Sequence, residues 1–333
     1  MKQLSAHQPI LWISCFLLCS CINMRSAATS TPSAIPTSTR TLIPFQTPIP
    51  TATETRLPIS TTWLPLDQLA NTVFERSFED RPDDMPDSFQ IHIIYVIPHN
   101  GLDRNLDTNG QLNLTISAIE KWLIDQTGGS RLRFDTYNGG LDITFYELKL
   151  TDQEIQEASV DFGGDNSFVR DVIENELRKN DLVESQKLYA VYFDGLSNYS
   201  CGGGAWPPQI PGQVAALYLN GMPPGSPPCG SNDFTASIDN MYYLEFAMLH
   251  EIMHTLGFVT QCGINHTRAG HVSDSPEDLM WAGDAPWSPQ FLDINNDDYF
   301  KNSNSSCPDL SNSAFLDPLP RAAELPPNWG QSR

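Results

Sequence analysis

The chain has 333 residues, and its 40 Asp and Glu against 19 Lys and Arg give a formal net charge of −21. This length leaves room for one large folded domain. A surface this acidic repels nucleic acid and anionic membranes, so we expect no nucleic-acid partner and no direct membrane contact by the domain. The same charge keeps an exported protein soluble and attracts cations, which leaves Ca²⁺ open as a cofactor.

The first 21 residues have the features of a bacterial lipoprotein signal peptide. After Lys2, an apolar stretch from 9 to 20 is too short to span a bilayer comfortably. It ends in Leu-Cys-Ser-Cys at Cys21, which resembles a lipobox, although ordinary signal cleavage slightly later is an alternative. We therefore expect an extracytoplasmic cell-surface lipoprotein, or a secreted protein, that contacts the membrane only through a lipid anchor at Cys21.

Thr, Pro and Ser dominate the next segment, residues 22–62. Such a composition cannot bury enough apolar surface to build a core. We predict a disordered linker here, followed by one folded domain over residues 63–333.

Periodicity of apolar residues predicts the elements of this domain. In chain order, we expect a strand at 89–97, a helix at 113–126, strands at 131–137 and 141–150, a helix at 166–179, and strands at 188–193 and 214–219. We interpret the last strand as the edge of the sheet. Gly202-Gly203-Gly204 before it indicates a mobile or tightly turned loop that could border a substrate groove.

Two acidic segments have oxygen side chains that could bind calcium, residues 103–110 and 293–298. The first lacks the ligand spacing and the distal Glu of an EF-hand. We favour a helix-capping turn for the first segment and a loop for the second, with a calcium site as the alternative.

Residues 250–257 read HEIMHTLG, the H-E-x-x-H pattern followed by a glycine. The apolar spacing around it predicts a buried helix over 242–256 that stops at Gly257. On a helix, His250 and His254 lie one turn apart and can bind one Zn²⁺, while Glu251 can take a proton from a metal-activated water. The alternative is a pair of histidines in ordinary core hydrogen bonds.

Four cysteines follow the signal region, namely Cys201, Cys229, Cys262 and Cys307. An even number in an exported chain predicts disulfides, and four cysteines allow three pairings. Sequence does not fix the pairing; we favour Cys201–Cys229 and Cys262–Cys307, the second of which would tie the loop after the zinc helix to the C-terminal segment. A zinc site made of cysteines is less favoured because no C-x-x-C is present.

A catalytic zinc needs a third protein ligand. Metzincin peptidases place a histidine where this chain has Thr260, so the usual spacing is absent. The stretch HTLGFVTQCGINHTRAGHVSDSPEDLMW nevertheless resembles a group of secreted bacterial metzincin-like proteins. The resemblance implies that His271 is the third ligand and that Met280 lies in a turn beneath the metal; His266 and Asp274 are the alternative ligands, and Met280 could equally be a core residue.

Similarity to this group covers most of residues 85–315 but is specific only around the zinc motif. It implies an α+β, metzincin-like (zincin) catalytic domain, in which a mixed twisted sheet packs on helices that include the H-E-x-x-H helix. The cleft would run along the edge strand.

Together these features predict a monomeric zinc metalloendopeptidase that acts on a peptide or protein substrate. His250, His254 and His271 would bind one Zn²⁺, and Glu251 would be the general base. Two alternatives stay open: a non-catalytic surface lipoprotein on the same scaffold, and a zinc amidase that acts on a non-peptide substrate.

Overall fold

The computed structural model describes residues 74–161, 168–304 and 306–330. The chain divides into two units, Met1–Pro58 and Ile59–Arg333, and all described residues belong to the second. The expected signal peptide at 1–21, with Cys21, and the expected linker at 22–62 lie outside the described residues. Among the helices of the described part, none is long and apolar enough to cross a membrane.

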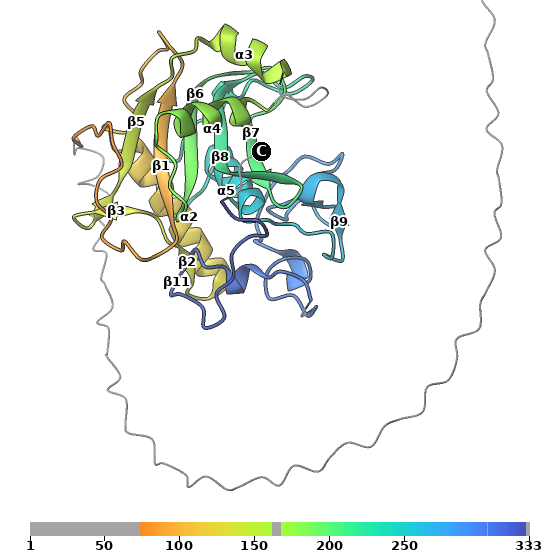
Figure 1. Cartoon of the computed structure of the whole chain (residues 1–333). Helices are drawn as coiled ribbons and strands as arrows, with labels where there is room; N and C mark the ends of the chain where they lie inside the picture. Colours follow the sequence, from red (N-terminus) through yellow and green to blue (C-terminus); the bar gives the residue numbers. More distant parts are fainter. Residues whose placement is uncertain (1–73, 162–167, 305, 331–333) are drawn as a thin grey trace, which may run out of the picture. The chain divides into compact units, whose positions relative to one another are not determined.

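A five-stranded mixed sheet, in the order β5-β1-β6-β8-β7, forms the centre of the folded unit (Figure 1). Four strands run parallel and the last is antiparallel to its neighbour. Their bounds are β1 Gln90–Ile97, β5 Ile143–Glu147, β6 Lys187–Ser197, β7 Gly202–Trp206 and β8 Ile210–Gly221. The expected mixed sheet packed on helices is confirmed, and its strands are mostly parallel.

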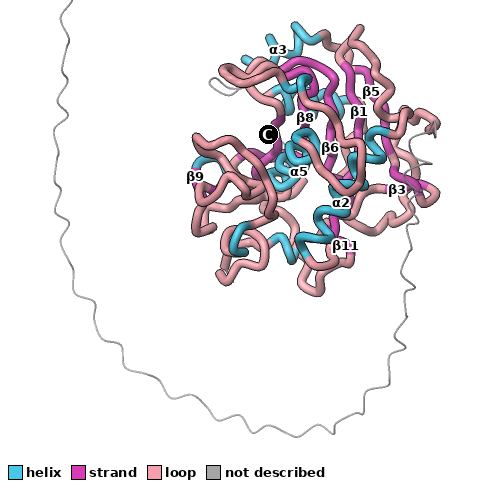
Figure 2. The backbone as a smooth tube through the Cα atoms, turned by 180° about the vertical axis from the view of Figure 1, so that it is seen from behind, coloured by secondary structure: helices cyan, strands magenta, loops and turns pink. Residues whose placement is uncertain are grey.

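Helices cover both faces of this sheet (Figures 1 and 2). On one face lie α2 (Gln111–Thr127) and α5 (Tyr243–Thr255), and on the other α3 (Asp152–Asp161) and α4 (Val169–Lys179). The fully buried strand β1 supplies both cores, because Ile91 and Ile93 point toward α2 and α5 while Ile94 and Val96 point toward α3 and α4. Burial of each such side chain contributes roughly 1.5–3 kcal/mol.

Short elements complete the unit. The two-residue strands pair as hairpins or long-range bridges: β2 Arg131–Leu132 with β11 Leu316–Asp317, β3 Thr136–Tyr137 with β4 Gly140–Leu141, and β9 His266–Thr267 with β10 His271–Val272. The 3-10 helices are η1 Cys229–Ser231, η2 Arg268–Gly270, η3 Ile294–Asn296 and η4 Leu310–Asn312.

One expectation about the sheet is wrong. The segment 214–219 is not an edge, because it lies inside β8, which pairs with β6 on one side and β7 on the other. The edge strand is β7, formed by the glycines that we expected in a mobile or tightly turned loop. Glycine has a low strand propensity, so tertiary packing decides here. Gly202 and Gly204 have no side chains on the face toward α5, so the strand can lie directly against that helix.

Smaller departures concern the first half of the domain. The strand expected at 131–137 is broken into β2 and β3, and the strand expected at 141–150 is limited to β4 and β5. Helix α3 was not expected. The helix expected at 166–179 begins at Val169 in the structure, where residues 162–167 are not described.

Both disulfides have the expected pairing, Cys201–Cys229 and Cys262–Cys307. The first joins the start of β7 to η1, and the second joins the segment after α5 to the C-terminal part of the chain. Two such bonds indicate an oxidising, extracytoplasmic environment.

Candidate metal centre

Three histidine rings converge at the end of α5. The Nε2 atoms of His250 and His254 are 3.0 Å apart, and Nε2 of His271, from β10, lies 3.2 Å from each. Four ligands around a zinc ion at about 2.0–2.1 Å would have neighbouring nitrogens about 3.3–3.4 Å apart. The three rings therefore have the spacing of a metal site.

Each ring is oriented by a hydrogen bond from its other nitrogen to a backbone carbonyl. Nδ1 of His250 contacts Leu279 O at 2.8 Å, that of His254 contacts Phe258 O at 3.0 Å, and that of His271 contacts Arg268 O at 3.1 Å. A carbonyl only accepts, so each Nδ1 is the donor and each Nε2 presents a lone pair. Three lone pairs facing one point repel one another unless a cation lies between them, and so these residues could hold a zinc ion.

Local backbone turns place these carbonyls. Gly257, with φ 92°, reverses the chain after α5 and returns Phe258 O to His254. Gly270, with φ 78°, packs so closely on Trp206 that a Cβ would lie 2.6 Å from the indole nitrogen. This contact fixes the hairpin that carries His271.

All three histidines are neutral in this environment. Burial, with His271 nearby, lowers the pKa of His250 to about 3, and burial, with its two histidine neighbours, lowers the pKa of His254 well below the ordinary value. Burial also lowers the pKa of His271. Neutral imidazole is the form that binds metals, so no proton has to be removed from these ligands near neutral pH.

Glu251 is half-buried beside the histidines and faces β7. A Cβ on Gly202 would lie 2.5 Å from its carboxyl oxygen and 2.8 Å from its Cγ, so a larger residue there would displace the Glu251 side chain. Burial raises the pKa of Glu251 to about 8, against the opposing effects of a hydrogen bond with the Gly204 backbone and the charge of Arg170. A cation held by the histidines would favour the carboxylate form.

The structure places the alternative ligands elsewhere. His266 stacks on Trp206, with ring centroids 6.1 Å apart and planes 15° apart. Asp274 lies in a group with Asp297 and Asp298, around the side-chain amide of Asn265. Of the three residues considered for the third position, only His271 is brought to His250 and His254.

Met280 is fully buried in the same core cluster as α5. Its backbone carbonyl accepts from Val272 at 2.9 Å, and its N–H donates to Asp278 at 2.7 Å. The turn that carries Met280 therefore also presents Leu279 O to His250.

The two acidic segments considered for calcium make contacts with the protein itself. Asp103 and Asp107 form ion pairs with Arg76 at 2.6 and 2.7 Å. Asp293 accepts backbone N–H groups of Tyr299 and Phe300 at 2.7 and 2.6 Å. The first segment forms a turn before α2, in which Asn109 Oδ1 accepts from the backbone N–H of Gln111 at 2.9 Å, although the N-cap residue itself is Gly110 and makes no side-chain cap hydrogen bond. The second segment is held by backbone hydrogen bonds around η3.

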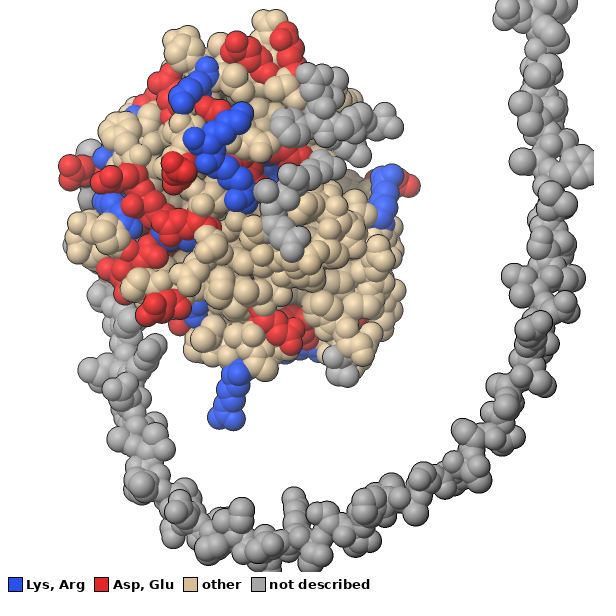
Figure 3. Space-filling model, viewed as in Figure 1, with Lys and Arg blue, Asp and Glu red and all other residues tan. Residues whose placement is uncertain are grey.

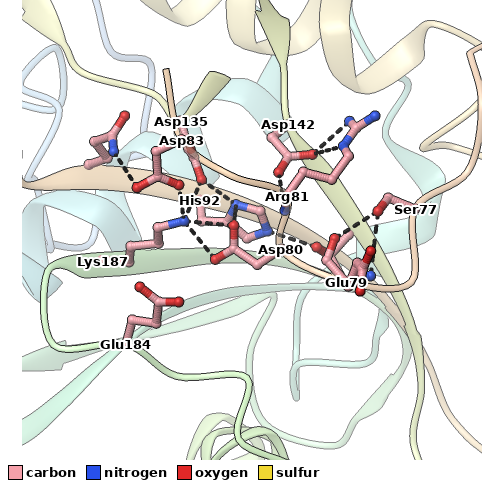
Figure 4. A network of polar contacts seen from close by, with 12 residues as sticks. Ser77, Glu79, Asp80, Arg81, Asp83, His92, Asp135, Asp142, Glu184 and Lys187 are labelled. Carbon is pink, nitrogen blue, oxygen red and sulfur yellow. Dashed lines mark hydrogen bonds and ion pairs between the residues drawn. The ribbon is translucent and has the colours of Figure 1, made fainter. Parts of the chain in front are cut away.

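A second group of potential ligands, formed by Asp80, His92, Asp135 and Asp142, lies around the start of β1 (Figure 4). Lys187 donates to Asp80, Asp83 and Asp135 at 2.6 to 2.8 Å, and Arg81 pairs with Asp142 at 2.6 Å. Protein cations therefore neutralise most of these carboxylates. The network attaches the segment before β1 to the sheet.

Two parts of the candidate site escaped the sequence reasoning. The carbonyls of Leu279, Phe258 and Arg268 are backbone atoms and have no residue-type signature. Strand β7 does have a sequence signature, the triplet of glycines. Glycine more often marks a turn, however, so the triplet did not predict a strand.

Comparison with known proteins gives little. No protein-family model and no curated protein match the chain. It is similar to two crystal structures of wild type OgpA from Akkermansia muciniphila. The first has 14% sequence identity and a TM-score of 0.30, over 57% of this chain and 52% of that chain. The second crystal form has 16% sequence identity and a TM-score of 0.34, over 70% of this chain and 63% of that chain. A structure of a chaperone-substrate complex matches with 14% identity and a TM-score of 0.28, over 54% of this chain and 26% of that one.

The chain thus spans between 52% and 63% of the length of OgpA in these matches. Likeness at these TM-scores does not indicate a function for this chain.

Proposed function

We propose that this protein is a zinc-dependent endopeptidase with a metzincin-like catalytic domain. The observation that carries the proposal is the convergence of three neutral imidazoles, whose Nε2 atoms are 3.0 to 3.2 Å apart. They lie beside Glu251, which is on the same helix as two of them. Three histidines and an open position are typical of catalytic rather than structural zinc. The mostly parallel sheet with one antiparallel edge strand against the H-E-x-x-H helix agrees with this family.

Zinc at this site would supply Lewis-acid chemistry, which acidifies a bound water and polarises a carbonyl. Glu251 is the only carboxylate of the H-E-x-x-H motif, and its position beside the histidines suits a general base. It would take the proton of the attacking water and deliver it to the leaving amine. Its half-buried surroundings strengthen its interaction with charge that develops during the reaction.

An extended substrate would lie along β7. Among the described strands, β7 pairs only with β8, which leaves its other side for main-chain hydrogen bonds with a peptide. Gly202 and Gly204 bring the strand onto Glu251 and His254, while Gly203 faces Tyr218 on the other side. On the face shown in Figure 3, the described surface in the region where Figure 1 places β9 has few charged side chains.

Attachment to the cell surface through Cys21 belongs to the same proposal and rests on the sequence of the signal region. A non-catalytic role was motivated by the missing histidine at the usual spacing. The 3.2 Å distance from Nε2 of His271 to Nε2 of His254 supports His271 as the third ligand and weakens this motive.

Substitution of Glu251 tests the function. We expect Glu251→Gln to keep zinc and fold but to lose peptide hydrolysis by at least about 100-fold, as general-base removal does. Glu147→Gln is the matched control, because Glu147 is 45% exposed on β5, at the opposite edge of the sheet from β7. Hydrolysis by Glu251→Gln at the rate of the control would rule out the assigned role.

A further inference from the structure

Strand β7 contacts the parts of the candidate metal centre in order along its length. Gly202 lies against the side chain of Glu251, and two residues further on Gly204 lies against Cβ of His254. The last residue of the strand, Trp206, reaches the loop that carries the third histidine. One strand therefore contacts the proposed general base, one metal ligand and the loop of another ligand.

Trp206 contacts both ends of the loop between His254 and the third ligand. Its indole N–H donates to Val259 O at 3.1 Å, at the start of the loop. At the end of the loop, a Cβ on Gly270 would lie 2.6 Å from Nε1 and 2.7 Å from Cε2 of the indole. The loop closes on itself at the same place, because the Val259 N–H donates to Gly270 O at 2.9 Å. The next residue is His271, so the indole holds the base from which this ligand projects.

The loop is also where this chain departs from the metzincin spacing. Thr260 stands at the position of the usual third histidine, and the loop continues until His271 supplies a ligand. The carbonyl that orients this ligand, Arg268 O at 3.1 Å from Nδ1, belongs to the same loop. Ordering a longer loop around a metal costs conformational entropy, so an anchor that holds the loop in the metal-free protein raises metal affinity.

The sheet fixes Trp206 in turn. Trp206 is buried, with 9% of its surface exposed, and it pairs with Ile210 where the chain passes from β7 to β8. A buried indole needs a partner for its N–H, and the carbonyl of Val259 is that partner. A phenyl or aliphatic side chain could fill the same space, but neither could donate a hydrogen bond to the loop.

We propose that Trp206 is a positioning residue for the third metal ligand, which holds the loop 259–270 so that Nε2 of His271 meets those of His250 and His254. Its side chain takes no part in the bond-breaking step. The inference rests on the three-histidine centre of the proposed function. It adds that the strand proposed to receive the peptide also sets the geometry of the metal.

The test uses Co²⁺ as the probe, because it takes the same kind of ligands as zinc and its visible absorption depends on coordination geometry. Metal-free protein is titrated with Co²⁺, zinc affinity is measured by competition, and urea unfolding gives the stability of each variant. Trp206→Leu removes both the ring and its N–H, and Trp206→Phe keeps a ring and removes the N–H. Trp329→Phe is the matched control, because Trp329 also donates its indole N–H to a backbone carbonyl, that of Ser185 at 2.8 Å, and its ring contacts Phe315 at 4.9 Å between centroids.

Trp206→Leu should bind Co²⁺ and Zn²⁺ about 10–100-fold more weakly than wild type, as loss of a group that orients a metal ligand does. Its visible absorption at saturation should also weaken, because the third histidine is displaced. Trp206→Phe should lie between Trp206→Leu and wild type in both measurements, and it decides the test alone if Trp206→Leu does not fold. Trp329→Phe should match wild type in metal affinity and absorption even where its urea midpoint falls.

The inference is overturned if Trp206→Phe has the metal affinity and absorption of wild type, or if Trp329→Phe loses both to the same extent. No metal binding by wild type would overturn the three-histidine centre of the proposed function, and this inference with it. Metal binding that is normal in wild type and unchanged in Trp206→Phe would overturn this inference alone.

Discussion

Contact between the glycine strand and the zinc helix can be tested by adding a single methyl group. A Cβ on Gly204 would lie 2.5 Å from the carbonyl oxygen of Glu251 and 2.8 Å from Cβ of His254. Both neighbours are part of α5, so neither can rotate away, and strand and helix would have to separate by roughly 1 Å. Overpacking of this kind costs about 1–3 kcal/mol.

Gly140→Ala is the matched control. Its Cβ would lie 3.8 Å from Tyr137 O, an ordinary contact, and at neither glycine does φ fall in the left-handed region. Replacement of glycine at such an unstrained, open position stabilises a protein by about 0.4–1 kcal/mol through the unfolded chain. The two variants should therefore change stability in opposite directions.

Urea unfolding of the metal-free proteins is the assay, because bound metal would add its own stabilisation. Gly204→Ala should unfold at lower urea than wild type and Gly140→Ala at equal or higher urea, with unchanged slopes. Zinc affinity should fall in Gly204→Ala alone, since the displaced helix carries His254. If Gly204→Ala were as stable as Gly140→Ala, the packing of β7 on α5 would be refuted.

Two further predictions concern stability. Replacing both Cys262 and Cys307 by Ser opens a loop whose ends are 45 residues apart. The free energy of unfolding should fall by about 4 kcal/mol relative to wild type, measured by urea unfolding. A urea midpoint equal to that of wild type would contradict this prediction. Burial, partly offset by Arg131, raises the pKa of Glu120 from 4.5 to about 8, so between these values the folded protein holds a proton that the unfolded chain has lost, and stability falls as pH rises. At about 1.4 kcal/mol per pKa unit, the free energy of unfolding falls by at most about 5 kcal/mol. Glu120→Gln should therefore gain stability relative to wild type as the pH rises from about 5 to about 8. A difference in stability that does not change with pH would contradict the raised pKa of Glu120.

Sequence reasoning worked where local geometry decides. His250 and His254 face the same way because a helix places residues four apart on one side, and Gly257 ends that helix because it can adopt a positive φ. Long apolar runs such as β1 and β6 were also predictable, because strands buried on both faces show little but β-branched and aromatic residues.

Features that depend on distant parts of the chain were not predictable in the same way. The position of His271 depends on the β9–β10 hairpin and its contact with Trp206, and only the resemblance indicated it. Strand β7 consists of residues with low strand propensity that pairing with β8 and packing on α5 hold extended. Likewise, the sequence left calcium binding by Asp103 and Asp107 open as an alternative, because their partner Arg76 comes from a separate segment of the chain.

Elemental analysis of the folded domain tests the central claim most directly, with His271→Ala compared with His266→Ala on the same hairpin. Wild type and His266→Ala should each retain about one zinc per chain after dialysis, because His266 stacks on Trp206 and is not one of the three proposed ligands. His271→Ala should lose it, because two histidines alone hold zinc weakly. Zinc retained by His271→Ala but lost from His266→Ala, or no zinc in wild type, would contradict the three-histidine metal centre.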